Sequence, residues 1–170
     1  MGVLPSVPPP RYTLREGTSP MRIYLTLIDD TPEALSALRF AARRAVKTGG
    51  GVEILALLPQ QEFIPFGGVQ ATMEEEARQH AEGLVARAAG TLFEESGVRP
   101  SLTVRSGDGP KVIREMIADN PQIAALVLGA ATGGAPGALV SHFAADAGSL
   151  PVPLMIVPGG LDAETIDRLS

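Results

Sequence analysis

The sequence predicts an α/β fold: a five-stranded parallel sheet with helices on both faces. Five short, mostly apolar runs are separated by segments whose apolar residues recur every three or four positions. Strands that are apolar throughout, rather than alternating, are typical of a parallel sheet buried on both sides. Strands that alternate with helices are joined by right-handed crossovers. The 170 residues fit a single domain of this kind.

Each predicted strand is a short run bounded by glycine, proline or polar residues. The five runs are residues 22–28, 52–58, 101–105, 123–128 and 152–157. The last run contains Pro153, which has no N–H group to donate to a strand neighbour. We therefore expect the fifth strand at an edge of the sheet.

The predicted helices combine apolar spacing with start and stop signals. They cover residues 32–48, 73–96, 110–119, 136–147 and 163–169, and a long loop is expected at 59–70. Thr31 can cap the first helix and Pro32 can occupy its first turn. Leu161 and Ile166 flank Asp162 at the spacing of a hydrophobic staple, which starts the last helix. The face that the first helix is expected to bury consists of Ala34, Leu35, Leu38, Ala41, Ala42, Ala45 and Val46.

The chain divides into three parts by composition. Residues 1–20 are rich in proline and lack periodicity, so we expect an N-terminal arm that docks on the domain or on a partner subunit. Residues 21–158 form the predicted folded domain, and residues 159–170 the short C-terminal helix. This arm has no basic segment followed by an apolar one, so no signal peptide is predicted.

Composition and charge exclude several classes of protein. No apolar run reaches the roughly 20 residues that cross a bilayer, so no membrane partner is expected. The net charge is -5, and the basic residues form no cluster beyond Arg43, Arg44 and Lys47 on one predicted helix, which is unlike a nucleic-acid-binding protein. The absence of cysteine excludes disulfides and thiolate sites and suits a reducing compartment. We therefore expect a cytoplasmic protein without a nucleic-acid partner.

The candidate site lies in the turns after the first, second and fourth strands, because ligands bind parallel sheets at the carboxyl ends of strands where the order reverses. The turn after the second strand is the loop that carries Phe66 to Gly68. Asp29 and Asp30 follow the first strand and could bind a ribose or Mg²⁺, or Asp30 or Thr31 could cap the helix. The fourth strand leads into the glycine-rich stretch VLGAATGGAPGALVSHF, residues 127–143. Its glycines could present backbone N–H groups to a phosphate, or only permit tight turns and close helix packing. No Lys or Arg lies between Arg114 and Arg168 to support a triphosphate.

Four stretches together resemble the universal stress protein family: LTLIDDTPEALSALRFAARRA, GDGPKVI, VLGA and PVPLMIVP. The resemblance extends from Met21 to Val157. It implies a Rossmann-like fold of the adenine nucleotide alpha hydrolase type with strand order 3-2-1-4-5. It also implies a dimer, and ATP binding in some members but not in others. In the binding members an Asp ends the first strand, and a Gly-x-x-Gly turn after the fourth is followed nine residues later by Gly-Ser or Gly-Thr.

This pattern maps only partly onto the chain. Thr132 replaces the second glycine, Val140 replaces the glycine before the serine, and the segment from Gly129 is two residues shorter. The resemblance therefore implies a degenerate site whose cofactor, if any, is ATP or another adenine nucleotide, bound weakly or not at all. The alternative is an intact backbone phosphate site in an ATP-binding signalling protein. The candidate binding residues are Asp29, Gly129, Thr132, Gly133 and Ser141.

The predicted function is that of a stress-response or ligand-sensing protein without enzyme activity beyond slow nucleotide hydrolysis. The apolar, uncharged strand 152–157 predicts a homodimer through that edge. A phosphoryl-accepting receiver domain is a weaker alternative, because it needs a Lys where Val157 precedes Pro158. An adenylating or ATP-splitting enzyme would carry an S-G-G-x-D-S type loop after the first strand, where this chain has IDDTPEA.

Overall fold

In the computed structural model, residues 21–58 and 67–170 are described. The predicted arm at residues 1–20 and most of the predicted loop at 59–70 lie outside the described residues. Within the described ranges, no helix is both long enough and apolar enough to cross a membrane.

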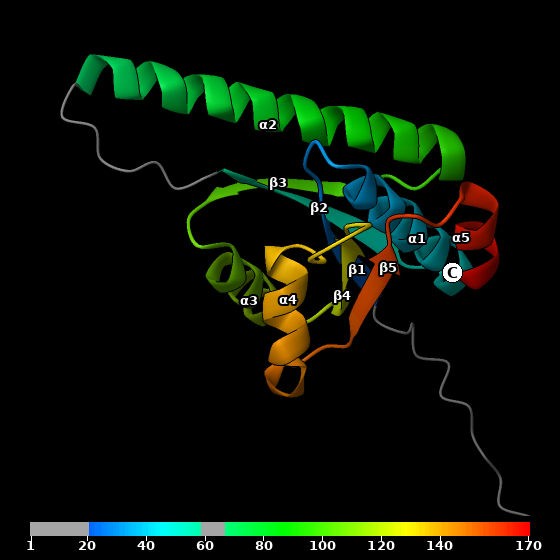
Figure 1. The fold of residues 1–170 in the computed structure, drawn as a ribbon. Helices are drawn as coiled ribbons and strands as arrows, with labels where there is room; N and C mark the ends of the chain where they lie inside the picture. The colour runs from blue at the N-terminus through cyan, green and yellow to red at the C-terminus, as the bar shows by residue number, and fades with distance from the viewer. Residues whose placement is uncertain (1–20, 59–66) are drawn as a thin grey trace, which may run out of the picture.

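The centre of the molecule is a five-stranded parallel sheet in the order β3-β2-β1-β4-β5 (Figure 1). This confirms both the predicted α/β class and the strand order. The order reverses between β1 and β4, so these two strands form the topological switch point. The strands are β1 Ile23–Leu27, β2 Gly51–Leu58, β3 Ser101–Ser106, β4 Ile123–Ala130 and β5 Leu154–Pro158.

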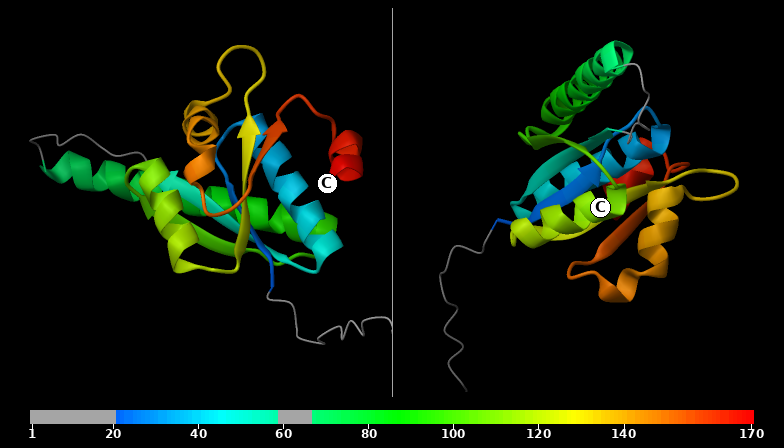
Figure 2. Two further views of the ribbon diagram at one scale, coloured as in Figure 1. Left: turned by 90° about the horizontal axis from the view of Figure 1, so that it is seen from below. Right: turned by 90° about the vertical axis from the view of Figure 1, so that its left-hand side faces the viewer.

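Helices cover both faces of the sheet. Figure 2 shows α1 and α2 on one side of the strands and α3 and α4 on the other. The short helix α5 packs against α1 rather than on the sheet. The helices are α1 Pro32–Thr48, α2 Gly67–Ser96, α3 Gly109–Asp119, α4 Ala138–Ala145 and α5 Ala163–Leu169, with a single 3₁₀ turn at Ala147–Ser149.

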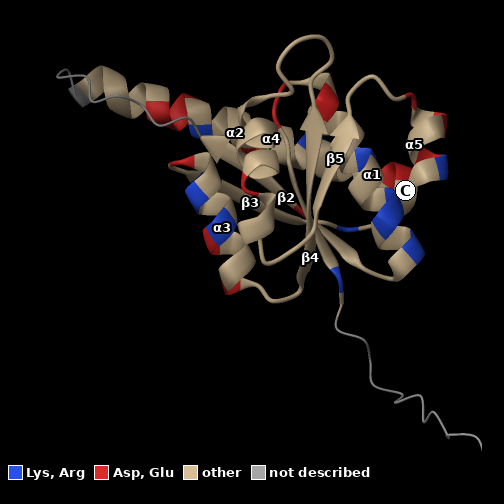
Figure 3. Cartoon of the chain, turned by 60° about the horizontal axis from the view of Figure 1, so that its bottom comes forward, with Lys and Arg blue, Asp and Glu red and all other residues tan. Residues whose placement is uncertain are grey.

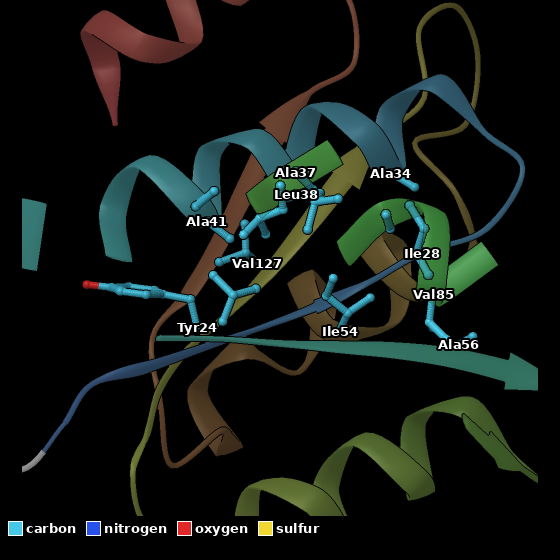
Figure 4. Close-up of a cluster of buried hydrophobic side chains, with 14 of the residues drawn as sticks. Tyr24, Ile28, Ala34, Ala37, Leu38, Ala41, Ile54, Ala56, Val85 and Val127 are labelled. Atoms are coloured by element: carbon cyan, nitrogen blue, oxygen red, sulfur yellow. The ribbon is translucent and has the colours of Figure 1, made fainter. Parts of the chain in front are cut away.

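The core consists of one apolar cluster on each face of the sheet. Small side chains of α1, such as Ala37 and Ala41, lie directly on Tyr24, Ile54 and Val127 of the strands (Figure 4). Because alanine side chains are short, this helix lies close against the sheet. On the other face, α3 and α4 contribute larger side chains, including Ile113, Met116 and Phe143. Side chains pointing to both faces explain why the inner strands β1, β2 and β4 are apolar almost throughout, whereas the edge strand β3 is mostly exposed and partly polar.

Helix α1 begins and ends as its sequence predicts, but its buried face is narrower. The Thr31 hydroxyl accepts a hydrogen bond from the Ala34 amide, and Gly49 ends the helix in the left-handed region at φ 63°. The prediction that Leu35 and Val46 are buried is wrong: they are 55% and 50% exposed. Both lie at the margins of the apolar stripe, beyond the part of the helix that the sheet covers.

Helix α2 is longer than predicted. It begins at Gly67 instead of Met73, so it spans 30 residues and about 45 Å. Its second half packs on the sheet through Ala81, Val85, Ala88 and Leu92. Its first half extends past the end of β3 (Figures 1 and 2), and Met73, where the sequence predicts the helix to begin, is 43% exposed there.

Strand β5 lies at the edge of the sheet, as predicted, although it starts at Leu154, directly after Pro153. Only β4 pairs with it in the described chain, where Pro153 serves as an acceptor for the Leu126 amide. The following helix α5 does not turn back over this edge. It is held on α1, where Arg39 binds both carboxylate oxygens of Asp167 at 2.8 Å.

Candidate functional site

A pocket of about 270 Å³ lies at the switch point of the sheet. It opens where the carboxyl ends of β1 and β4 meet the first turns of α1 and α4, since Leu27, Leu128, Ala34 and Leu139 all line it. This is the place where parallel sheets bind ligands. Its volume lies near the lower end of the range of typical ligand pockets, about 300–1,000 Å³.

The turn between β1 and α1 forms one wall. The Asp29 Oδ1 atom accepts hydrogen bonds from the Thr31 amide at 2.9 Å and from the Thr31 hydroxyl at 2.5 Å. Thr31 in turn caps α1, so Asp29 orients the residue that starts the helix. Of the two capping residues that the sequence suggests, the structure selects Thr31. Asp30 points elsewhere and contacts His80 Nε2 of α2 at 2.8 Å.

Gly129, near the end of β4, allows α1 to approach the sheet. A Cβ atom at this position would lie 2.0 Å from the Glu33 carbonyl oxygen. Gly159, just after β5, faces the same turn of α1, and its Cβ would lie 2.8 Å from the Glu33 Cβ. The two glycines therefore allow the first turn of α1 to lie against the edge of the pocket. Close packing of α1 on β4 is thus one reason why residue 129 is a glycine.

The loop from β4 to α4 forms the opposite wall and carries no charged residue (Figure 3). The loop closes on itself, because the Ala131 amide donates to the Pro136 carbonyl at 3.1 Å. Gly133, Gly134 and Gly137 have positive φ angles, which explains the need for glycine in this stretch. Gly137 precedes α4 and provides no side-chain cap, so the first amides of α4 are left for another acceptor.

The structure brings together only some of the predicted site residues. Asp29 and Gly129 line the pocket. Thr132, Gly133 and Ser141 are exposed and are not among its described lining residues. Thr132 sits against the turn after β5, since a Cβ on Gly160 would lie 3.1 Å from its methyl group.

The charge at the pocket is negative. Asp29 and Glu33 line it, whereas none of the described lining residues is Lys or Arg. Apart from Thr31, the remaining described lining residues are apolar or glycine, including Leu27, Leu139 and the buried Val140. No group of three or more His, Asp or Glu side chains able to hold a metal is found among the described residues. The carboxylates of the pocket can therefore accept hydrogen bonds from hydroxyl or amino groups, and only the first amides of α4 are left for a group of high negative charge.

Sequence reasoning missed Glu33 as a pocket residue, and it considered Gly137 only as one of the glycines of the stretch 127–143. Both belong to helix starts that follow strands of the switch point, and this is a signal that could have found them. The rule for parallel sheets points to the turns between strand and helix, whereas the pocket also uses the first helical turn itself.

Comparison with known proteins agrees with this architecture. The sequence model of the universal stress protein family matches residues 21–158. The chain belongs to the universal stress protein family. No curated protein sequence matches it.

Solved structures of universal stress proteins share this fold. The protein UspA from Lactobacillus plantarum is 15% identical and aligns over 82% of this chain and 99% of its own, with a TM-score of 0.68. A universal stress protein solved in complex with cAMP is 15% identical over 82% and 98% of the two chains, with a TM-score of 0.57. One from Archaeoglobus fulgidus in complex with dAMP is 20% identical over 81% and 97%, with a TM-score of 0.55. At these identities the likeness shows the fold.

Proposed function

We propose that this universal stress protein is a non-catalytic, ligand-sensing protein of the cytoplasmic stress response, with weak or absent affinity for ATP. One observation carries the proposal: the switch-point pocket is lined by Asp29 and Glu33 and by no Lys or Arg among its described residues. A triphosphate is usually held by charge-assisted contacts from such cations.

The position of the pocket supports the view that it binds a ligand, whatever the charge of that ligand. It lies at the switch point between β1 and β4, in a fold for which complexes with cAMP and dAMP are known in other proteins. Its size suits a small ligand, or part of a nucleotide, better than a whole triphosphate. In the proposal, Asp29 and Gly129 contact the ligand directly, and Thr132, Gly133 and Ser141 belong to the surrounding loop and helix.

A second candidate function is ATP binding through backbone donors alone. The uncapped first turn of α4 favours this alternative, because amides at a helix N-terminus attract phosphate. The shortened loop and Val140 both weigh against this alternative. Val140 carries a methyl-bearing side chain at a position where a glycine would leave the backbone open.

Calorimetric titration with ATP and Mg²⁺ tests the proposal. We expect a dissociation constant well above about 1 μM, a value that corresponds to roughly -8 kcal/mol. A constant at or below that value would instead establish the backbone phosphate site. Mass spectrometry under non-denaturing conditions complements the titration, because it reports any co-purified nucleotide and the oligomeric state together.

We further propose that the protein is a homodimer paired through β5. The strand has one unpaired edge within the described chain, and Ile156 is 42% exposed on it. An apolar edge without a charged side chain is a liability for a monomer in water. Pairing of two copies about a twofold axis would satisfy the backbone groups of both edges.

A further inference from the structure

Glu33 is held at the mouth of the pocket by backbone packing. Its carbonyl oxygen lies where a Cβ on Gly129 would be, and its Cα and Cβ lie 3.2 Å and 2.8 Å from a Cβ built on Gly159. The first turn of α1 therefore cannot rotate Glu33 away without separating the helix from the sheet. The backbone of Glu33 is thereby fixed at the edge of the pocket, so its carboxylate stays within reach of a ligand that enters between α1 and α4.

The charges around the pocket can be compared directly. A helix N-terminus carries roughly half a positive charge, so α1 and α4 together contribute about +1. Asp29 and Glu33 contribute two full negative charges. The Ala34 amide of α1 is also already bound to Thr31, which leaves less of that terminus for a ligand. The carboxylates outweigh the helix ends, and the pocket has a net charge of about -1.

We propose that Glu33 determines the charge class of the ligand, so that the pocket takes an uncharged nucleoside-sized molecule in preference to a nucleotide polyphosphate. This proposal rests on the proposed function of the same pocket. The apolar walls of Leu27, Leu128 and Leu139 can contact a flat ring. The carboxylates of Asp29 and Glu33 can accept hydrogen bonds from hydroxyl groups, as a ribose offers.

Adenosine and Mg²⁺-ATP are the probes for the test, titrated into the wild type and two variants by calorimetry. Glu33→Gln removes the charge and keeps the shape of the side chain. Glu164→Gln is the matched control, because Glu164 is also the second residue of its helix, α5, and does not line the pocket. Glu33→Ala provides a second charge-free variant, and thermal unfolding checks that each protein is folded.

We expect the wild type to bind adenosine more tightly than ATP. Glu33→Gln and Glu33→Ala should tighten ATP binding about threefold to tenfold, the effect of removing one charge about 8 Å from a triphosphate in water. Adenosine binding should change less than about twofold in Glu33→Gln, because an uncharged ligand feels little of this change. Glu164→Gln should resemble the wild type with both ligands.

Two results would overturn the inference. The first is a ratio of ATP to adenosine affinity that stays the same in both Glu33 variants, or changes equally in Glu164→Gln. The second is the absence of adenosine binding to the folded wild type at millimolar concentration. Failure of the proposed function looks different, since it requires tight ATP binding by the wild type itself, whatever the variants do.

Discussion

Replacement of Gly129 by Ala tests the close approach of α1 to β4 on which the pocket depends. The new Cβ would lie 2.0 Å from the Glu33 carbonyl oxygen and 2.4 Å from its carbon, both backbone atoms. Since real contacts of this kind stay above 3.0 Å, helix and strand must separate by at least 1.0 Å. Overpacking of a rigid core costs about 1–3 kcal/mol, and a backbone clash lies at or beyond the upper end.

We therefore expect Gly129→Ala to lower the free energy of unfolding by about 3 kcal/mol, and Tm by roughly 6–12 °C for a domain of this size. Urea and thermal unfolding followed by far-UV circular dichroism measure both quantities. Gly90→Ala in α2 is the control, because a Cβ there meets nothing within 4 Å. In a helix this same change should stabilise by up to about 1 kcal/mol. A Gly129→Ala protein within about 0.5 kcal/mol of the wild type would refute the packing argument.

Three further predictions concern other parts of the molecule. Ile156→Lys should convert the proposed dimer into a folded monomer by light scattering, and a wild-type mass of 17.7 kDa at tens of micromolar would contradict the dimer. Asp167→Asn should lower the free energy of unfolding in urea by about 1 kcal/mol at pH 7. Arg39 holds the pKa of Asp167 below its usual value, so this stabilisation is present above about pH 4 and is lost as pH falls through the lowered pKa. An equal difference at pH 7 and at pH 2 would be inconsistent with the ion pair. Backbone amides of residues 67–80 should exchange with solvent much faster than those of 81–92, because only the second half of α2 packs on the sheet; uniform protection would argue against the extension.

The sequence alone determined the class of the fold and the starts of several elements. Continuous apolar runs predicted the buried parallel strands, because side chains on both faces of such a strand must leave water. Thr31 and Asp162 marked helix starts, because a capping side chain bonds only to nearby amides of the same helix. Each of them accepts a hydrogen bond from the backbone amide three residues later in the chain. Pro153 pointed to an edge strand, and β5 is one, although the proline precedes the strand.

Tertiary structure decided which apolar residues are buried. Leu35 and Val46 fit the helical period, but the sheet covers only part of the face that this period defines. Met73 likewise continues the stripe of α2 past the end of the sheet. Periodicity records which residues share a side of a helix, whereas burial depends on how far the neighbouring element extends.

The pocket depended most on the tertiary structure. The sequence pointed to the ends of β1 and β4, and with them to Asp29 and Gly129, through the rule for parallel sheets. It did not reveal that Glu33 and Gly137 meet at the same pocket, because they are far apart in the chain and belong to helices on opposite faces of the sheet. Their proximity follows from the crossover connections and from the short distance that Gly129 allows between α1 and β4. Local pattern thus selects the elements, and packing between distant elements determines the charge and size of the site.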